Sequence, residues 1–460
     1  MAMCMPTQRS FVAIIKIEAA PGSGRRGQGV RPEKRNLERL GASTAKCLAV
    51  AFVSFPYASA AQGQDFDPRT PLEDRSRPDY THEPIILGGL EVRPQIETSL
   101  EYIDNVFASE LVDADDIVMN IRPSVTATEQ RADRRLNLRV ATGYQTYLDN
   151  SAEDRFQLQG SVDTKFGLGT ATRPFGGANF TLNDTSGPAL TTGDNITETF
   201  RTLSYGANLG LEQGIGSFTV EGEARATRYE YQGQLVFGDD TFESAIRDNT
   251  YYEGRGRIAY SARPDRRFYV EGRFSRFDFD EQALSVLPNL PDYFLTDRSV
   301  DIATVVGGVQ IQVTELLSLD ANLGYARIEY DNPEEPGVNA LSASASVYYS
   351  PTRLTRFQIR ASRDVDDTIN PLFVSFLRTG VALTAEHELL RNVLLRSDIR
   401  YASFESSEDG QIGEEMQFSG TASYYISPRI SVGLRGEYFQ RSGLAAGDQT
   451  RFRITVGYRL

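Results

Sequence analysis

Residues 451–460, RFRITVGYRL, alternate strictly between apolar and polar side chains. One side of an extended chain would carry Phe452, Ile454, Val456, Tyr458 and Leu460. The other side would carry Arg451, Arg453, Thr455, Gly457 and Arg459. A soluble sandwich turns such an apolar side inward, whereas a membrane barrel turns it outward into lipid. The direction in which the apolar side faces therefore decides the fold class.

The same alternation recurs from residue 93 to the end of the chain, most clearly over 136–145, 155–166, 218–227 and 416–426. A period of two over such lengths predicts strands and not helices. Short and long connections between these segments alternate along the chain. Short ones such as TELL (314–317) and SPR (427–429) alternate with long acidic ones such as NVFASELVDADD (105–116) and SSEDGQIGEE (406–415).

Short turns at one end of a sheet and long loops at the other are typical of bacterial outer-membrane barrels. Counting the segments gives about 18 strands. An even number places the N-terminus and the C-terminus of the barrel chain on the same side, the side of the short turns. The predicted fold class is all-β, a transmembrane antiparallel up-and-down β-barrel over 93–460. In that fold the apolar side faces lipid, and closure leaves no unpaired strand edge in hydrocarbon.

The N-terminal region predicts an export signal. Basic residues over 25–46 precede the short apolar run CLAVAFVSFPYA (47–58) and the small-residue pattern ASAA (58–61). We expect a cleaved signal peptide over 1–60, with residues 1–29 as a mis-called start and Val30 or Leu37 as alternative starts. Residues 61–92 are polar and rich in proline, which predicts a flexible periplasmic lead-in with a short strand near 85–87.

Composition excludes several classes of protein. The formal net charge is −14, and removing nine basic and three acidic residues with 1–60 lowers it to about −20, so nucleic acid is not an expected partner. No run of 18 apolar residues follows residue 61, which excludes a helical membrane protein. Both cysteines, Cys4 and Cys47, lie in the predicted leader. The mature chain would then have no thiol for a disulfide, a metal site or a nucleophile.

The polar side of the strands carries arginine and acid at recurring positions. It could be the wet face of a soluble sheet or the wall of a water-filled lumen, and the leader, strand count and loop asymmetry favour the lumen. The candidate lumen-lining residues, which would set selectivity, are Arg139, Arg225, Arg255, Arg257, Arg273, Arg356, Arg360, Arg396, Arg400, Arg435, Arg453, Glu223, Glu253, Glu271, Asp398 and Glu437.

The alternating hairpins over 93–460 and the terminal strand RFRITVGYRL resemble the putative type-2 β-barrel porins, a family of outer-membrane proteins. The resemblance implies outer-membrane lipid and lipopolysaccharide as surroundings, and the barrel-assembly machinery as a partner that reads the C-terminal strand. The strand departs from the usual terminal Phe by ending in Leu460. Some relatives resemble conduits for exopolysaccharide that work with a periplasmic polysaccharide-export protein.

The sequence thus predicts a porin-like channel in the cell outer membrane that passes polar or anionic solutes, with exopolysaccharide export as a narrower possibility. A structural or adhesive barrel without transport is one alternative. A rim-sited enzyme is a weaker one, since His82 and His387 are the only histidines and neither has a nucleophile within the same motif. Acidic clusters such as DADD (113–116) could gather Ca²⁺ or Mg²⁺ but lack a calcium-loop spacing, so we expect no cofactor and no metal.

Overall fold

The computed structural model describes residues 67–75, 77–108, 114–186, 199–237, 240–280, 299–333, 337–367, 375–406, 410–443 and 446–460. Residues 65–460 form one compact unit. The predicted signal peptide and the tips of several long loops lie outside the described residues. The described residues include four 3-10 helices: η1 (Leu72–Asp74), η2 (Pro78–Tyr80), η3 (Ser151–Glu153) and η4 (Ser244–Arg247). No helix in the described part of the chain has the length and apolar character needed to cross a bilayer.

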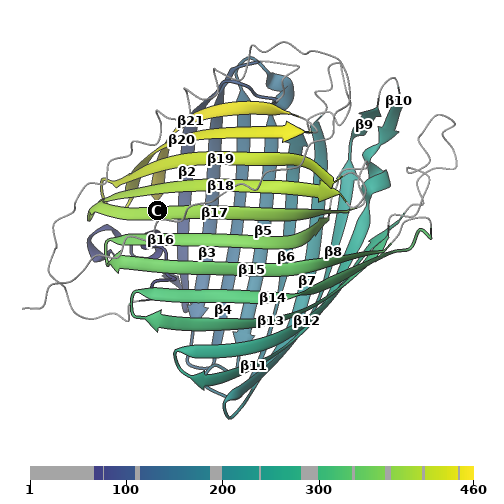
Figure 1. Ribbon diagram of the computed structural model, residues 1–460. Helices are drawn as coiled ribbons and strands as arrows, with labels where there is room; N and C mark the ends of the chain where they lie inside the picture. Colours follow the sequence, from purple (N-terminus) through teal and green to yellow (C-terminus); the bar gives the residue numbers. More distant parts are fainter. Residues whose placement is uncertain are drawn as a thin grey trace, which may run out of the picture. The chain divides into compact units, whose positions relative to one another are not determined.

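The described residues form an 18-strand antiparallel ring, as predicted (Figure 1). In order around it come β2 (Leu90–Ile103), β3 (Asp116–Gln130), β4 (Arg134–Tyr147), β5 (Arg155–Phe166), β6 (Thr172–Ser186), β7 (Thr199–Ile215), β8 (Phe218–Gln232), β11 (Asn249–Arg263), β12 (Arg266–Phe279), β13 (Val300–Thr314), β14 (Leu317–Tyr330), β15 (Val338–Thr352), β16 (Thr355–Asp367), β17 (Ser375–Leu390), β18 (Val393–Ser406), β19 (Gly410–Tyr425), β20 (Ile430–Gly443) and β21 (Gly447–Arg459).

The ring closes where the last strand meets the first. Strand β2 pairs with β3 through Leu100 and Met119, and with β21 through Leu100 and Ile454. The backbone N–H of Leu460 then donates to the carbonyl of Pro94 at 3.0 Å. Every strand of the ring therefore has two neighbours, which satisfies the backbone groups that an open edge would leave unpaired in lipid.

The apolar half of each strand lies on the outside of the ring. On β21, Phe452 and Ile454 are 60% and 56% exposed, whereas Glu101, which ion-pairs with Arg453 between them, is 3% exposed. Large apolar side chains are exposed at alternating positions of most other strands as well, including Leu209, Val305 and Leu323. The opening stretch of sequence is thus oriented as a membrane barrel requires, with its apolar side outward.

An arginine introduced on the outer half should therefore lower the stability of the folded barrel far more than one introduced on the inner half. We expect Ile454→Arg, near the middle of β21, to lower the free energy of unfolding by about 2–4 kcal/mol, the cost of a cation facing the bilayer midplane. The matched control is Thr455→Arg, whose site lies between Ser99 and Gly433 on the inner half. Urea unfolding in lipid vesicles measures both variants. An equal loss in the two variants would contradict the outward orientation.

The two ends of the ring differ in their connections. Four short turns of two residues follow a β-bulge or register shift, at 264–265, 315–316, 353–354 and 391–392. Another two-residue turn joins β7 to β8 through Gly216, whose φ of 59° suits glycine. The opposite end carries the long connections, including a hairpin of β9 (Gln234–Phe237) and β10 (Asp240–Glu243).

Two segments differ from the sequence-based expectation. The sequence predicts a long loop over 406–415, but β18 continues to Ser406 and β19 begins at Gly410, because cross-strand pairing accommodates the glycines and acids of this stretch. The lead-in predicted over 61–92 is described from residue 67 onward. It contains η1, η2 and, where a short strand is expected near 85–87, the strand β1 (Ile85–Leu87), which pairs with the start of β2. The first barrel strand begins at Leu90 and not at 93.

Candidate functional site: the charged inner wall

The polar half of each strand faces the inside of the ring. On β16, Phe357 and Ile359 are exposed on the outer surface, so Arg356, Gln358 and Arg360 between and beside them point inward. Acids that would be costly in lipid lie on this inner half, among them Glu101, Glu271 and Glu386, each less than 5% exposed. The inner wall is therefore polar and ionic, as in barrels that enclose water.

Strands β8, β11 and β12 carry a ladder of opposite charges on this wall. The Arg255 guanidinium lies 2.5 Å from Glu221 and 2.6 Å from Glu223 on β8. Arg257 lies 2.5 Å from Glu271 on β12, and Arg273 also contacts Glu271 at 3.0 Å. Each cross-strand pair of this kind stabilises a sheet by roughly 0.2–1 kcal/mol. The ladder leaves little net charge on this part of the wall.

A second charged region lies where the ring closes. Arg453 on β21 donates to Glu101 on β2 at 2.6 Å, so an ion pair bridges the first and last strands on the inside. On β20, Arg435 contacts Glu437 two residues along the same strand at 2.5 Å. Both arginines are therefore occupied by a carboxylate of the wall.

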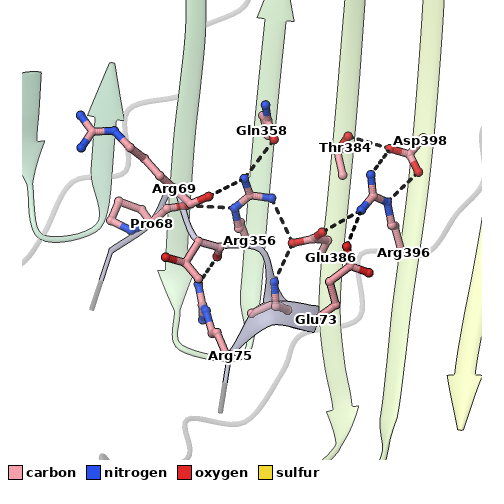
Figure 2. A network of polar contacts seen from close by, with 12 residues as sticks. Pro68, Arg69, Glu73, Arg75, Arg356, Gln358, Thr384, Glu386, Arg396 and Asp398 are labelled. Atoms are coloured by element: carbon pink, nitrogen blue, oxygen red, sulfur yellow. Dashed lines mark hydrogen bonds and ion pairs between the residues drawn. The ribbon is translucent and has the colours of Figure 1, made fainter. Parts of the chain in front are cut away.

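Residues 67–75 and 77–80, which we call the strap, lie against the inner wall near the short turns, and Figure 2 shows the contacts of Pro68, Arg69, Glu73 and Arg75. Arg356 Nε donates to the carbonyl of Pro68 at 2.9 Å, and its Nη2 donates to that of Arg69 at 3.0 Å. The Nη1 of the same guanidinium contacts Glu386 Oε2 on β17 at 3.0 Å. Arg356 thus joins β16, β17 and the strap through one planar fork of donors.

The strap excludes water from this ion pair. Glu386 Oε2 also accepts the backbone N–H of Leu72 at 3.1 Å, and the Leu72 side chain is fully buried. The side chains of Arg356 and Glu386 are 3% and 1% exposed. Beyond Glu386, Arg396 on β18 reaches Asp398 at 2.9 Å and Glu73 of the strap at 3.7 Å (Figure 2). The strap is therefore docked by a network that covers three strands.

Farther along, the strap follows the short-turn rim. The Arg77 guanidinium lies 3.7 Å from Glu388 and 5.5 Å from the ring centroid of Tyr425 on β19. Tyr80 stacks near the same ring, with centroids 6.5 Å apart. From there the chain leads to β1 and β2. The strap therefore occupies space inside the barrel over β16–β18 and then runs along the rim past β19.

The predicted wall residues divide into two groups. Those with a carboxylate or guanidinium partner within 4.0 Å are Arg225, Arg255, Arg257, Arg273, Arg356, Arg396, Arg435, Arg453, Glu223, Glu253, Glu271, Asp398 and Glu437. In the part of the chain that the structure describes, no ion pair is found for Arg139, Arg360 and Arg400.

Sequence reasoning missed the acids Glu101 and Glu386 and the entire strap, whereas Glu221 lies on the polar face that the alternation predicts. Glu386 lies beside His387 in the sequence. Its position in the alternation of β17 puts its side chain on the polar half of the strand, and this signal could have identified it. In the structure it lies opposite Arg356.

A family model for putative beta-barrel porin 2 matches residues 77–460. The chain belongs to this family. The match covers the whole ring and begins within the strap, so the inner wall described above is the wall of a porin-type barrel. No curated protein sequence is similar enough to count as a relative.

Two solved bacterial structures are similar to this chain at low identity. OccK2 (OpdF) of Pseudomonas aeruginosa is 12% identical with a TM-score of 0.43, over 80% of this chain and 98% of that one. The ferric-catecholate import receptor Fiu of E. coli is also 12% identical with a TM-score of 0.43, over 82% of each chain. These likenesses are too distant to indicate what this porin transports.

The acidic cluster and the histidine that the sequence singles out have local contacts in the described part of this porin. No group of three or more His, Cys, Asp or Glu in the described ranges could hold a metal ion. Asp116, from the acidic cluster DADD, accepts backbone N–H groups of Leu148 and Asn150 at 3.0 and 2.8 Å and so orders the neighbouring loop. His387 lies on the outer half of β17, with its Nδ1 3.0 Å from the Thr355 hydroxyl.

Proposed function

We propose that this porin forms a water-filled channel in the cell outer membrane and passes polar or anionic solutes. The observation that carries the proposal is a closed 18-strand ring with an apolar outer half and an ionic inner half. Rings of 16–18 strands are wide enough to leave an aqueous channel. The short turns would face the periplasm, and the outer half would contact lipid and lipopolysaccharide.

Planar-bilayer recording tests the channel directly. We expect the purified mature chain to give stepwise conductance in KCl, because its wall offers charged and hydroxyl groups to hydrated ions. The folded state of the same sample is checked by heat-modifiable gel mobility. A folded barrel that shows neither conductance nor solute uptake into vesicles would contradict the proposal, and would favour an adhesive or structural barrel instead.

A narrower candidate is an export conduit for exopolysaccharide, working with a periplasmic polysaccharide-export protein. It is supported by hydroxyl and amide groups on the inner half of β14 and β15, from Asn322, Ser342, Ser344 and Ser346, with Asp320 opposite Ser346 as the acid among them. Asn322 donates to the Ser344 hydroxyl at 2.7 Å. Hydroxyl and amide groups without charge suit the hydroxyl groups of sugars.

Deleting the gene and measuring extracellular polymer tests this candidate. Export should stop while polymer accumulates in the periplasm, and a copy of the gene should restore it. Unchanged surface polymer in the deletion strain would remove this candidate and leave the general channel in place. A rim-sited enzyme is not part of the proposal, because the described histidine in the ring, His387, lies on the lipid-facing half.

A further inference from the structure

Two of the three predicted wall arginines that lack an ion pair in the described ranges lie close together. Arg360 on β16 and Arg400 on β18 both lie opposite Ala382 on β17, which separates them. With strands spaced about 4.8 Å apart, their Cα atoms lie about 10 Å from each other in one row across the sheet. The side chains of all three residues lie on the inner half of their strands. Both guanidinium groups therefore reach into the lumen, one on each side of the Ala382 methyl group.

From β15 to β19 this row carries no acid, and its next position, on β14, is Asp320 opposite Ser346, whose carboxylate accepts from the Gln310 amide at 3.2 Å. Arg360 lies opposite Ser346 on β15, and Arg400 lies opposite Gln417 on β19. The Gln417 Oε1 is 3.5 Å from Arg400, at the outer limit of a hydrogen bond. Within the described ranges, neither arginine lies within 4.0 Å of a carboxylate, and both are exposed.

Two acids that flank the row, Asp398 and Glu415, are held in ion pairs with other arginines. Asp398, two residues before Arg400, accepts two bonds from Arg396 and one from the Thr384 hydroxyl (Figure 2). On the loop side of the row, Glu415 contacts Arg441 at 2.7 Å. These acids cannot turn to Arg360 or Arg400 without breaking their present ion pairs.

Two like charges whose strands are separated by one strand repel each other weakly across the lumen, and a bound anion would relieve that repulsion. A guanidinium presents a planar fork of donors that matches a carboxylate in two parallel hydrogen bonds. The small side chain of Ala382 leaves room between the two forks. The surrounding Ser346 and Gln417 can bond hydroxyl groups of the same ligand.

We propose that Arg360 and Arg400 form a binding subsite in the lumen for carboxylate-bearing organic anions. This inference rests on the proposed channel function and names the class of solute. The carboxylates could belong to a small dicarboxylate that bridges the two forks or to an acidic sugar polymer that passes along the wall.

Current block in planar bilayers tests the subsite, with succinate and oligogalacturonate as probes and neutral maltohexaose as the uncharged comparison. We expect saturable block of the parent channel by at least one acidic probe and little block by maltohexaose. In the Arg360→Gln/Arg400→Gln variant the half-blocking concentration should rise by about tenfold or more, because two charge-assisted forks are lost. The probe that blocks shows which source of carboxylate the subsite accepts.

Two control variants separate a local subsite from the general potential of the lumen. Arg139→Gln removes another unpaired arginine of the inner wall, on β4, and should leave the block within about twofold of the parent. Arg360→Lys/Arg400→Lys retains both charges without the planar fork and should give an intermediate value. Conductance of the double Gln variant in KCl shows that its barrel is folded and open.

Unchanged block in the double Gln variant, or an equal loss in Arg139→Gln, would overturn the subsite while leaving the channel intact. No conductance in the parent would instead contradict the proposed channel. Calorimetric titration of the detergent-solubilised barrel with both acidic probes would then decide the subsite by itself. Binding that is lost in the double Gln variant supports it, and absent binding in the parent overturns it.

Discussion

Replacing Arg356 by methionine is expected to detach the strap from the barrel wall. The variant keeps a long side chain but removes the donors to Pro68, Arg69 and Glu386. Removing one partner of a buried ion pair costs about 3–5 kcal/mol, because the remaining charge stays in a dry site. Here the strap can leave and let water reach Glu386. The loss should therefore appear as undocking of the strap and not as unfolding of the ring.

A single cysteine in the strap measures this undocking. Leu72 is fully buried, and the sequence beyond the predicted leader contains no cysteine, so Leu72→Cys gives a thiol whose maleimide labelling reports strap release. Labelling should be at least about 100-fold faster in the Arg356→Met background, as follows from a cost of 3 kcal/mol or more. Thr81→Cys, just beyond the strap and exposed, should label fast in both backgrounds.

The matched control is Arg435→Met. Arg435 also pairs with an acid, Glu437, but its side chain is 41% exposed, against 3% for Arg356. A solvated pair of this kind contributes about 0–1 kcal/mol, so the labelling of the Leu72→Cys thiol should change by less than about fivefold. Equal labelling of that thiol in the parent and Arg356→Met backgrounds would show that the guanidinium does not hold the strap.

Deleting residues 67–80 is expected to raise single-channel conductance. The strap lies on the inner half of β16–β18, so its removal widens the aqueous path at the short-turn end and exposes Arg356, Glu386 and Arg396 to water. Ring closure should be unaffected, because β2 begins at Leu90 and its pairing with β21 does not involve the strap. Planar-bilayer recording of the deletion variant against the parent measures the change.

A synthetic peptide of residues 67–80 provides the control for that deletion. Added on the short-turn side, it should lower the conductance of the deletion variant towards the parent value, because the seat on Arg356 and Glu386 is retained. The same peptide should have little effect on a deletion variant that also carries Arg356→Met. Conductance equal to the parent's in the deletion variant would show that the strap does not narrow the path.

Local alternation made several features predictable. Period two over 451–460 indicates a strand and also which residues share a side, because neighbouring side chains in a strand point to opposite faces. The short connections are readable for a similar reason, since TELL and SPR interrupt the alternation over a few residues. Where glycines and acids continue a strand, as over 410–415, composition misleads, because pairing with β18 overrides it.

Pairing between distant residues was not predictable in the same way. Glu386 sits in the stretch AEHELL, where its neighbour His387 drew attention, and nothing local connects it to Leu72 more than 300 residues away. The strap reads as a polar, proline-containing linker, because its docking depends on backbone carbonyls that every sequence has. The sequence does not distinguish Arg360 and Arg400 from the other wall arginines, because strand register decides which side chains lie beside them.

The sequence by itself determined the strands, the number of about 18, the apolar and ionic halves and the end at which the turns are short, since each follows from spacing along one chain segment. The tertiary structure decided which charges neutralise each other, which wall arginines remain unpaired, and where the strap docks. Those outcomes depend on strand register and ring closure, which bring together residues that no local pattern relates.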